Sequence, residues 1–279
     1  MTDEKIISIL DRIATALEIQ NGLLHTKPVD WQATKTFVWQ AEKKTLKPVR
    51  HSSALPLNLL KGIDHNTDIL MANTEKFARG APANNALLWG SRGTGKSAIV
   101  KSLHKELSVH APLYLIEINR EDISTLPTLL DILRNEQDYR FILFCDDLSF
   151  DKDENDYKSL KTVLDGGLEQ KPEHIIFYAT SNRRHLMPRD MIENERRTGI
   201  HPSEAVEEKV SLSDRFGLWL GFYPYNQETY LSMIDAYAAH FGIDIPEDDL
   251  HQQALEWSIT RGNRSGRVAW QFIQNVRAS

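Results

Sequence analysis

The sequence predicts an α/β fold with a parallel sheet of five strands, because five apolar runs alternate with helical patterns between residues 86 and 222. Each run is continuously apolar, as in strands that are covered on both faces. Alternation of strands with helices is typical of parallel sheets. The five runs are Ala86–Trp89, Leu113–Ile116, Phe141–Phe144, Ile175–Tyr178 and Leu218–Phe222.

The two ends of the chain are expected to be helical. Near the N-terminus, Ile6, Leu10, Ile13 and Leu17 form one apolar helical stripe, which predicts a helix that packs on the core or binds a partner. After Pro224 the strand pattern stops, and residues 226–241 and 247–275 have helical patterns. We therefore expect a mainly helical N-terminal extension and a small all-helical C-terminal domain.

Aromatic and basic residues are interleaved in the segment 31–50. Phe37 and Trp39 alternate as on one face of a strand, with Trp31 before them and several lysines around them. Such a set can stack on and track a nucleic-acid strand. The alternative, which we favour, is that the aromatic side chains pack inward and the lysines are solvated.

Composition and charge exclude several classes of protein. The chain of 279 residues has 41% apolar and 26% charged residues, which is typical of a globular protein and not of a disordered or collagen-like one. The net charge of 33 − 39 = −6 argues against general attraction to nucleic acid or anionic membranes.

Three further features predict a cytoplasmic protein. The single cysteine, Cys145, excludes an intrachain disulfide and fits a reducing compartment. No run of about 18 apolar residues predicts a membrane span. The polar, acidic start of the chain lacks the basic and apolar segments of a signal peptide.

A phosphate-binding loop follows the first apolar run. The segment Gly90–Ser97, Gly-Ser-Arg-Gly-Thr-Gly-Lys-Ser, fits the pattern G-x-x-x-x-G-K-[ST] between a predicted strand and a helix that starts near Lys96. Its glycines let backbone N–H groups point at phosphate oxygens, and the helix N-terminus adds its positive dipole end. Lys96 is expected to reach the β- and γ-phosphates, and the Ser97 hydroxyl to bind Mg²⁺.

Two carboxylates, Asp146 and Asp147, follow the run Phe141–Phe144. In a parallel α/β sheet, the carboxyl end of such a strand lies beside the phosphate-binding loop. Asp146 is expected to hold Mg²⁺ through water. Asp147 is expected to orient or deprotonate the attacking water. The loop and the two acids together predict a nucleoside triphosphatase.

Residues 60–275 resemble the AAA+ ATPases. In that family the polar end of a strand senses the γ-phosphate, and the match here, Ala179–Asn182, implies this role for Asn182. Gly62–Asp64 resembles the segment that contacts adenine, which implies that Ile63 binds the base.

Two arginine motifs extend the resemblance. Leu212–Gly217 resembles the arginine-finger segment in the form found in replication initiators and helicase loaders, which implies that Arg215 enters a neighbouring subunit's site. Gly262–Arg267 resembles the sensor 2 motif, with Arg267 as the expected sensor and Arg264 as the alternative.

A narrower resemblance concerns Asn84–Ser97 and Tyr178–Leu186. These stretches are similar to an uncharacterised bacterial family of AAA-type ATP-binding proteins with a domain of unknown function. This resemblance implies ATP binding but says little about the client.

Three features bear on the reaction and on the client. Asp147 stands where most AAA+ enzymes have Glu, so a water is less well placed and slow hydrolysis is expected. Glu117–Asp122 lacks the aromatic–apolar–Gly triplet of protein-threading unfoldases. A basic segment, 183–197, is either a solvated loop or a contact for nucleic acid or another subunit.

The sequence therefore predicts a P-loop NTPase of AAA+ type with an N-terminal extension (1–55), a nucleotide-binding domain (56–224) and a helical lid (225–279). The expected function is Mg²⁺-dependent ATP hydrolysis in a homo-oligomer that acts on a protein or nucleic acid. The alternative is a nucleotide-gated switch with little turnover, and a P-loop kinase is a weaker third. The expected ATP-binding residues are Gly90, Ser91, Arg92, Gly93, Thr94, Gly95, Lys96, Ser97, Ala98, Ile63 and Arg267.

Overall fold

The computed structural model describes residues 9, 29–50, 53–150, 159–161, 163–164, 171–184, 186 and 214–277. The N-terminal stripe predicted as a helix, Ile6, Leu10, Ile13 and Leu17, lies outside the described residues. The same holds for most of the basic segment after Arg184.

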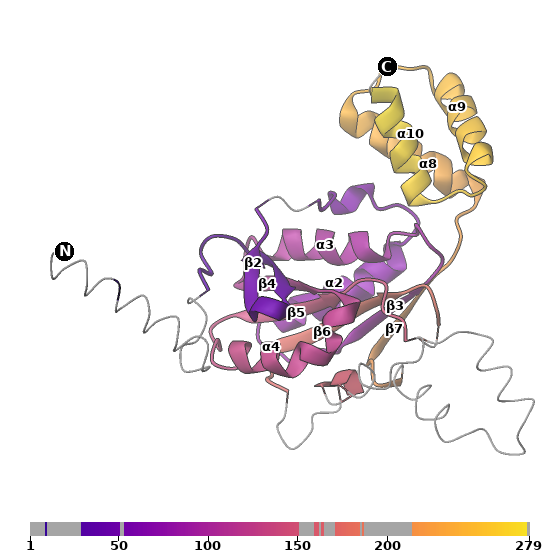
Figure 1. Cartoon of the computed structure of the whole chain (residues 1–279). Helices are drawn as coiled ribbons and strands as arrows, with labels where there is room; N and C mark the ends of the chain where they lie inside the picture. The colour runs from indigo at the N-terminus through magenta and orange to yellow at the C-terminus, as the bar shows by residue number, and fades with distance from the viewer. Residues whose placement is uncertain are drawn as a thin grey trace, which may run out of the picture.

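One sheet of seven strands forms the centre of the molecule, in the order β2-β1-β4-β5-β6-β3-β7 (Figure 1). Six strands run parallel, and only β2 is antiparallel to its neighbour. The five predicted strands are confirmed as β3 (Ala86–Gly90), β4 (Leu113–Ile118), β5 (Arg140–Cys145), β6 (Ile175–Ser181) and β7 (Leu218–Phe222).

The prediction of five strands was wrong, because β1 (Thr36–Gln40) and β2 (Thr45–Pro48) extend the sheet beyond β4. These strands form a hairpin around the short 3₁₀ helix η1 (Ala41–Lys43). The extension is therefore not wholly helical.

The aromatic residues of this hairpin region are core residues. Phe37 and Trp39 are each 1% exposed, and Trp31 packs edge-on against Phe37 and Tyr114. Their rings are therefore not available to stack on a nucleic-acid strand, and the inward-packing alternative is confirmed for them.

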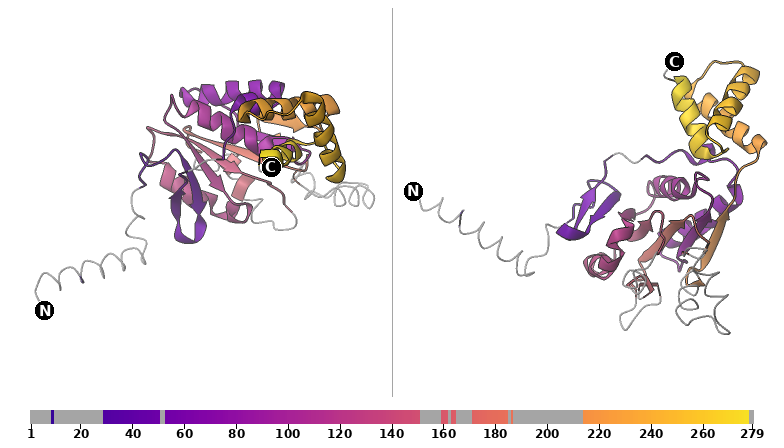
Figure 2. Two further views of the ribbon diagram at one scale, coloured as in Figure 1. Left: turned by 90° about the horizontal axis from the view of Figure 1, so that it is seen from above. Right: turned by 45° about the vertical axis from the view of Figure 1, so that its right-hand side comes forward.

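Helices cover both faces of the sheet (Figures 1 and 2). On one face, α2 (Asp64–Ala78) and α3 (Lys96–Leu107) bury Leu70, Ile99 and Leu103 against the strands. On the other face, α4 (Leu126–Leu133) packs below the sheet and follows the 3₁₀ helix η3 (Arg120–Thr125). A third 3₁₀ helix, η2 (Leu57–Leu59), precedes α2.

Three helices with a core of their own follow the last strand. They are α8 (Gln227–Phe241), α9 (Glu247–Thr260) and α10 (Gly266–Arg277). The Asn226 side chain caps α8 by accepting a hydrogen bond from the Thr229 N–H, and Gly242 ends it at a φ of 65°. The stretch predicted at 247–275 is two helices, since the chain turns at Gly262 with a φ of 71°.

A search of the described residues for a helix with the length and apolar character needed to span a bilayer finds none.

Candidate nucleotide-binding site

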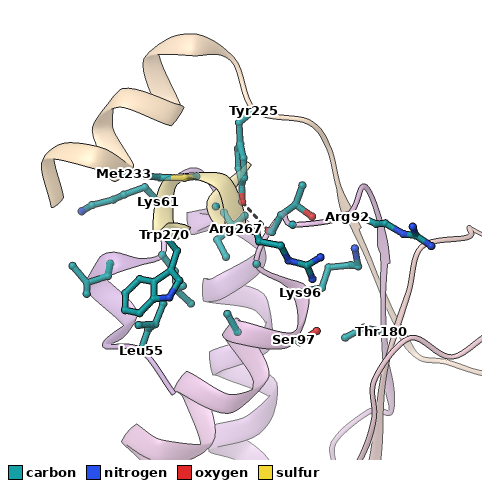
Figure 3. Close-up of a pocket in the computed structure, with 18 of the residues that line it drawn as sticks. Leu55, Lys61, Arg92, Lys96, Ser97, Thr180, Tyr225, Met233, Arg267 and Trp270 are labelled. Carbon is teal, nitrogen blue, oxygen red and sulfur yellow. Dashed lines mark hydrogen bonds between the residues drawn. The ribbon is translucent and has the colours of Figure 1, made fainter. Parts of the chain in front are cut away.

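A cavity of about 580 Å³ lies between the phosphate-binding loop, the ends of β5 and β6, and the C-terminal helices (Figure 3). Its volume falls within the usual range for small-ligand pockets, roughly 300–1,000 Å³. Most of the predicted site residues line it, namely Ile63, Arg92, Gly93, Thr94, Gly95, Lys96, Ser97, Ala98, Asp146, Asp147, Asn182 and Arg267.

Gly90 and Ser91 form the base of the loop, where it meets β7. Gly90 has a φ of 132°, and a Cβ there would come within 1.9 Å of the Phe222 carbonyl oxygen, so only glycine fits. The Ser91 N–H donates to that carbonyl oxygen at 3.0 Å. These contacts fix the loop to the sheet and aim the N-terminus of α3, which begins at Lys96, into the cavity.

Lys96 is almost fully buried, with 7% exposure. Its ammonium donates to the carbonyl oxygens of Gly90 and Ser91 at 2.9 and 2.6 Å, and to Asn182 Oδ1 at 3.3 Å. Burial lowers the pKa of Lys96 to about 8, although Asp146 and Asp147 oppose the shift. Phosphate oxygens bound beside this lysine would therefore favour its charged form.

Asp146 accepts two short hydrogen bonds at the end of β5. The hydroxyls of Ser97 and Thr180 both donate to its Oδ1 at 2.5 Å. A carboxylate and hydroxyl oxygens form the hard donor set that Mg²⁺ prefers, and this ion keeps several of its waters. The side chains at this point therefore fit a hydrated Mg²⁺ ion.

Asp147 is held in an unusual conformation. Its φ of 53° lies in the left-handed region, which costs about 1–2 kcal/mol for a residue other than glycine. The Thr180 hydroxyl accepts the Asp147 N–H at 2.9 Å, and Asn182 Nδ2 donates to Asp147 Oδ1 at 2.6 Å. Since Lys96 also donates to Asn182, this amide links the lysine to the carboxylate.

The C-terminal helices close the other side of the cavity. Arg267 and Trp270 of α10 line it with Met233 and Tyr237 of α8, whereas Arg264 is not among its lining residues. The Tyr225 hydroxyl donates to the Thr94 carbonyl oxygen at 2.7 Å (Figure 3).

The sequence reasoning missed Thr180, Tyr225 and Trp270 as site residues. A threonine at the carboxyl end of an otherwise apolar strand was a usable signal for Thr180. Nothing in the local sequence indicated the two aromatic residues.

Arg215 lies near the amino ends of the parallel strands, whereas the phosphate-binding loop follows the carboxyl end of β3. It precedes β7, whose Leu218 pairs with Ala86 at the start of β3, while the loop follows Gly90 at the end of β3. A five-residue strand spans about 16 Å. The side chain of Arg215 therefore cannot complete the cavity of its own chain.

One arginine of the basic segment packs on the sheet. The Arg184 guanidinium lies 5.1 Å from the ring centre of Trp89 and 5.5 Å from that of Trp219. Arg189, Arg196 and Arg197 lie outside the described residues.

Among solved structures, the chain is similar to RuvB of Thermotoga maritima, a Holliday junction branch migration motor. The TM-score is 0.53 at 17% identity, over 80% of this chain and 64% of RuvB. A mutant form of the same RuvB gives a TM-score of 0.54 at 18% identity with the same coverage. This chain therefore spans less than two thirds of RuvB, and at such identity the likeness shows a shared fold.

The comparison with curated proteins finds no match. A family model described as "Protein of unknown function (DUF815)" matches residues 32–279, which is most of the chain. The chain therefore belongs to the DUF815 family, and it has the fold of an AAA+ P-loop ATPase.

Proposed function

We propose that the protein binds ATP with Mg²⁺ and hydrolyses it to drive a conformational change in a client or in its own assembly. The observation that carries this proposal is that one cavity collects a buried lysine, a hydroxyl–carboxylate pair and a second carboxylate tied to an amide. Each has a defined task in phosphoryl transfer to water.

The apolar end of the cavity suits a planar base. Leu55, Leu59, Ile63 and Trp270 line it together, and Trp270 is placed to contact an aromatic ring (Figure 3). The phosphates would then extend toward the loop and the N-terminus of α3, where Lys96 exchanges loop carbonyl oxygens for phosphate oxygens. Arg267 approaches from the helical side, which we propose to be a lid.

Ser97 and Asp146 would hold the Mg²⁺ ion, which supplies charge neutralisation on the phosphates when bound. Thr180 positions Asp146 through its hydrogen bond. Asp147 would accept the proton of the attacking water, and Asn182 would orient that water or the γ-phosphate. In the free protein Asn182 is hydrogen-bonded to Lys96 and Asp147, so either role would use its second amide hydrogen or lone pair, or exchange one of these bonds.

We further propose that hydrolysis requires an oligomer. Arg215 lies too far from its own cavity, so it can contribute only to that of another copy. An arginine finger contributes about 10³–10⁵-fold in rate in other phosphoryl-transfer systems. RuvB is a Holliday junction branch migration motor, but the likeness extends to the fold only. The client of this protein is therefore proposed to be either a protein or a nucleic acid.

A cytoplasmic location is part of the proposal. The only cysteine, Cys145, is buried in β5, and burial raises the pKa of its thiol, so the chain depends on no disulfide.

The second candidate function is a nucleotide-gated switch. The observation that favours it is that Asp147 is one methylene shorter than glutamate and is already hydrogen-bonded to Asn182. In such a switch, ATP would change the bonds of Asn182 and Arg267, and hence the position of the helices, with little turnover.

The test is ATP hydrolysis as a function of protein concentration for the wild type, Lys96→Ala and Arg215→Ala. Arg79→Ala is the matched control, because Arg79 is an exposed arginine that caps α2 and pairs with Glu75 of that helix. An oligomeric ATPase predicts that specific activity rises with concentration in the wild type and control, and that both other variants lose it. If the wild type binds ATP but turns over no faster than Lys96→Ala at any concentration, the switch is favoured.

A further inference from the structure

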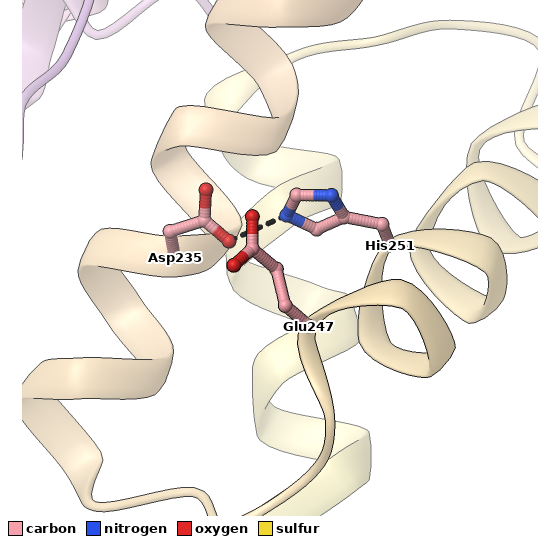
Figure 4. Close-up of side chains that lie close together, drawn as sticks. All are labelled: Asp235, Glu247 and His251. Atoms are coloured by element: carbon pink, nitrogen blue, oxygen red, sulfur yellow. Dashed lines mark hydrogen bonds and ion pairs between the residues drawn. The ribbon is translucent and has the colours of Figure 1, made fainter.

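A second group of side chains with metal-binding chemistry lies in the C-terminal helices, away from the nucleotide cavity. Asp235 projects from α8, and Glu247 and His251 project from α9 toward it (Figure 4). One potential ligand atom from each lies within 4.8 Å of the other two. None of the three lines the nucleotide cavity.

The two helices hold these side chains at defined positions. Glu247 and His251 are four residues apart, so they lie on the same face of α9. The neighbours in sequence, Ile234 and Leu250, are buried in the core of the helical bundle. The Tyr230 hydroxyl donates to the Ala254 carbonyl oxygen at 3.0 Å and joins α8 to α9 in the buried layer.

The charges of these three side chains favour binding of a cation. Asp235 Oδ1 lies 2.6 Å from His251 Nε2, and the Glu247 carboxylate converges on the same pair. Two carboxylates face one imidazole, which carries at most a single positive charge. A divalent ion would balance both carboxylates and use the imidazole nitrogen as a neutral ligand.

We propose that Asp235, Glu247 and His251 bind a divalent cation of the zinc type and thereby cross-link α8 to α9. One nitrogen and two carboxylate oxygens match the donors of Zn²⁺ sites, whereas Ca²⁺ and Mg²⁺ take oxygen ligands only. Around a tetrahedral ion with bonds of about 2.1 Å, ligand atoms lie about 3.4 Å apart. Side-chain rotation would bring the three ligand atoms to this spacing. It would lengthen the Asp235–His251 contact and move the Glu247 carboxylate closer to both.

The site is open to solvent on one side. The side chain of His251 is 22% exposed and that of Asp235 is 45% exposed, so an ion can enter without unfolding of the bundle. Three protein ligands leave a fourth position for water or for a group from a partner. Because α8 also contributes Met233 and Tyr237 to the nucleotide cavity, the cross-link would stiffen one wall of that cavity. The metal site itself does not depend on the proposed ATPase function.

The test is Zn²⁺ binding by the untagged, nucleotide-free full chain, measured by competition with a chromogenic chelator. We expect one Zn²⁺ per chain and no comparable binding of Mg²⁺ or Ca²⁺. His251→Ala and Glu247→Gln should each weaken binding by more than about tenfold, since loss even of outer-shell partners costs about 10–100-fold. Zn²⁺ should also raise the melting temperature of the wild type but not that of His251→Ala.

Two control variants make the result specific. His240→Ala removes an exposed histidine of α8 outside the group, and Asp146→Asn removes the candidate Mg²⁺ ligand of the nucleotide site. Both should bind Zn²⁺ as the wild type does. The proposal is overturned if the wild type binds no Zn²⁺, if His251→Ala binds it equally well, or if His240→Ala loses it too. Glu247→Gln changes an exposed side chain without changing its shape, so it keeps the test valid should His251→Ala fold poorly.

Discussion

Replacing Thr180 by valine tests whether one buried hydroxyl organises the acidic end of the nucleotide site. Thr180 is 1% exposed, and its hydroxyl donates to Asp146 Oδ1 while accepting the Asp147 N–H. Valine has nearly the same shape but can make neither bond. The substitution therefore removes two hydrogen bonds and leaves the packing almost unchanged.

The magnitude follows from the two bonds. A hydrogen bond to a charged group contributes about 1.5–3 kcal/mol, and a bond between neutral groups about 1 kcal/mol. We expect Thr180→Val to lower the free energy of unfolding by about 2.5–4 kcal/mol. We also expect weaker Mg²⁺-dependent ATP binding, because Asp146 loses one of its two hydroxyl donors and Asp147 loses the bond that fixes its left-handed backbone.

The assay is urea unfolding followed by tryptophan fluorescence, together with titration of ATP in the presence and absence of Mg²⁺. Thr180→Ser is the matched control, since it keeps the hydroxyl and loses one methyl group, worth about 1 kcal/mol. If Thr180→Val is no less stable than Thr180→Ser and binds Mg²⁺-ATP equally well, the hydroxyl does not organise the site and the reasoning is refuted.

Two further predictions concern the phosphate-binding loop. Burial lowers the pKa of Lys96 to about 8, so the free protein loses this proton as the pH rises above that value, whereas bound phosphates favour the charged form. ATP affinity should therefore be level below about pH 8 and fall above it. Titrations of ATP binding from about pH 7 to about pH 9.5 would reveal this dependence. Gly93→Ala should weaken ATP binding and destabilise the protein by more than the 1–2 kcal/mol or so of a left-handed alanine, because its Cβ would lie 2.8 Å from Ser265 Oγ. Gly242→Ala is its control in thermal unfolding, with a similar φ and no atom within 4 Å of the new Cβ; equal losses in both would contradict the predicted overlap.

The core of the fold and the phosphate-binding loop could be predicted because their signals are local. Lys96 and Ser97 stand in a fixed pattern between a strand and a helix, and both line the cavity. The β1–β2 hairpin was counted outside the sheet because two short strands carry little periodicity, although the alternation of Phe37 and Trp39 indicated one of them.

The contacts that join distant segments could not be predicted. Thr180 follows Asp147 by more than thirty residues, and only the pairing of β5 with β6 brings them together. The sequence left Arg264 and Arg267 as alternatives because both fit one motif. Of the two, Arg267 lines the cavity and Arg264 does not, and the sensor role of Arg267 stays a prediction. The roles of Asp147, Asn182 and Arg215 in catalysis stay predictions, as do the domain boundaries.

The pairing of β1 with β4 has a practical consequence for anyone who wishes to shorten the protein. Residue 56 is the predicted start of the nucleotide-binding domain, but a fragment beginning there would lose both strands of the hairpin and Trp31. The freed edge of β4 would present unpaired N–H and C=O groups, and Tyr114 would lose the rings of Trp31 and Phe37. Such edges recruit strands from other chains. A fragment that contains the nucleotide site and stays soluble should therefore begin no later than residue 29.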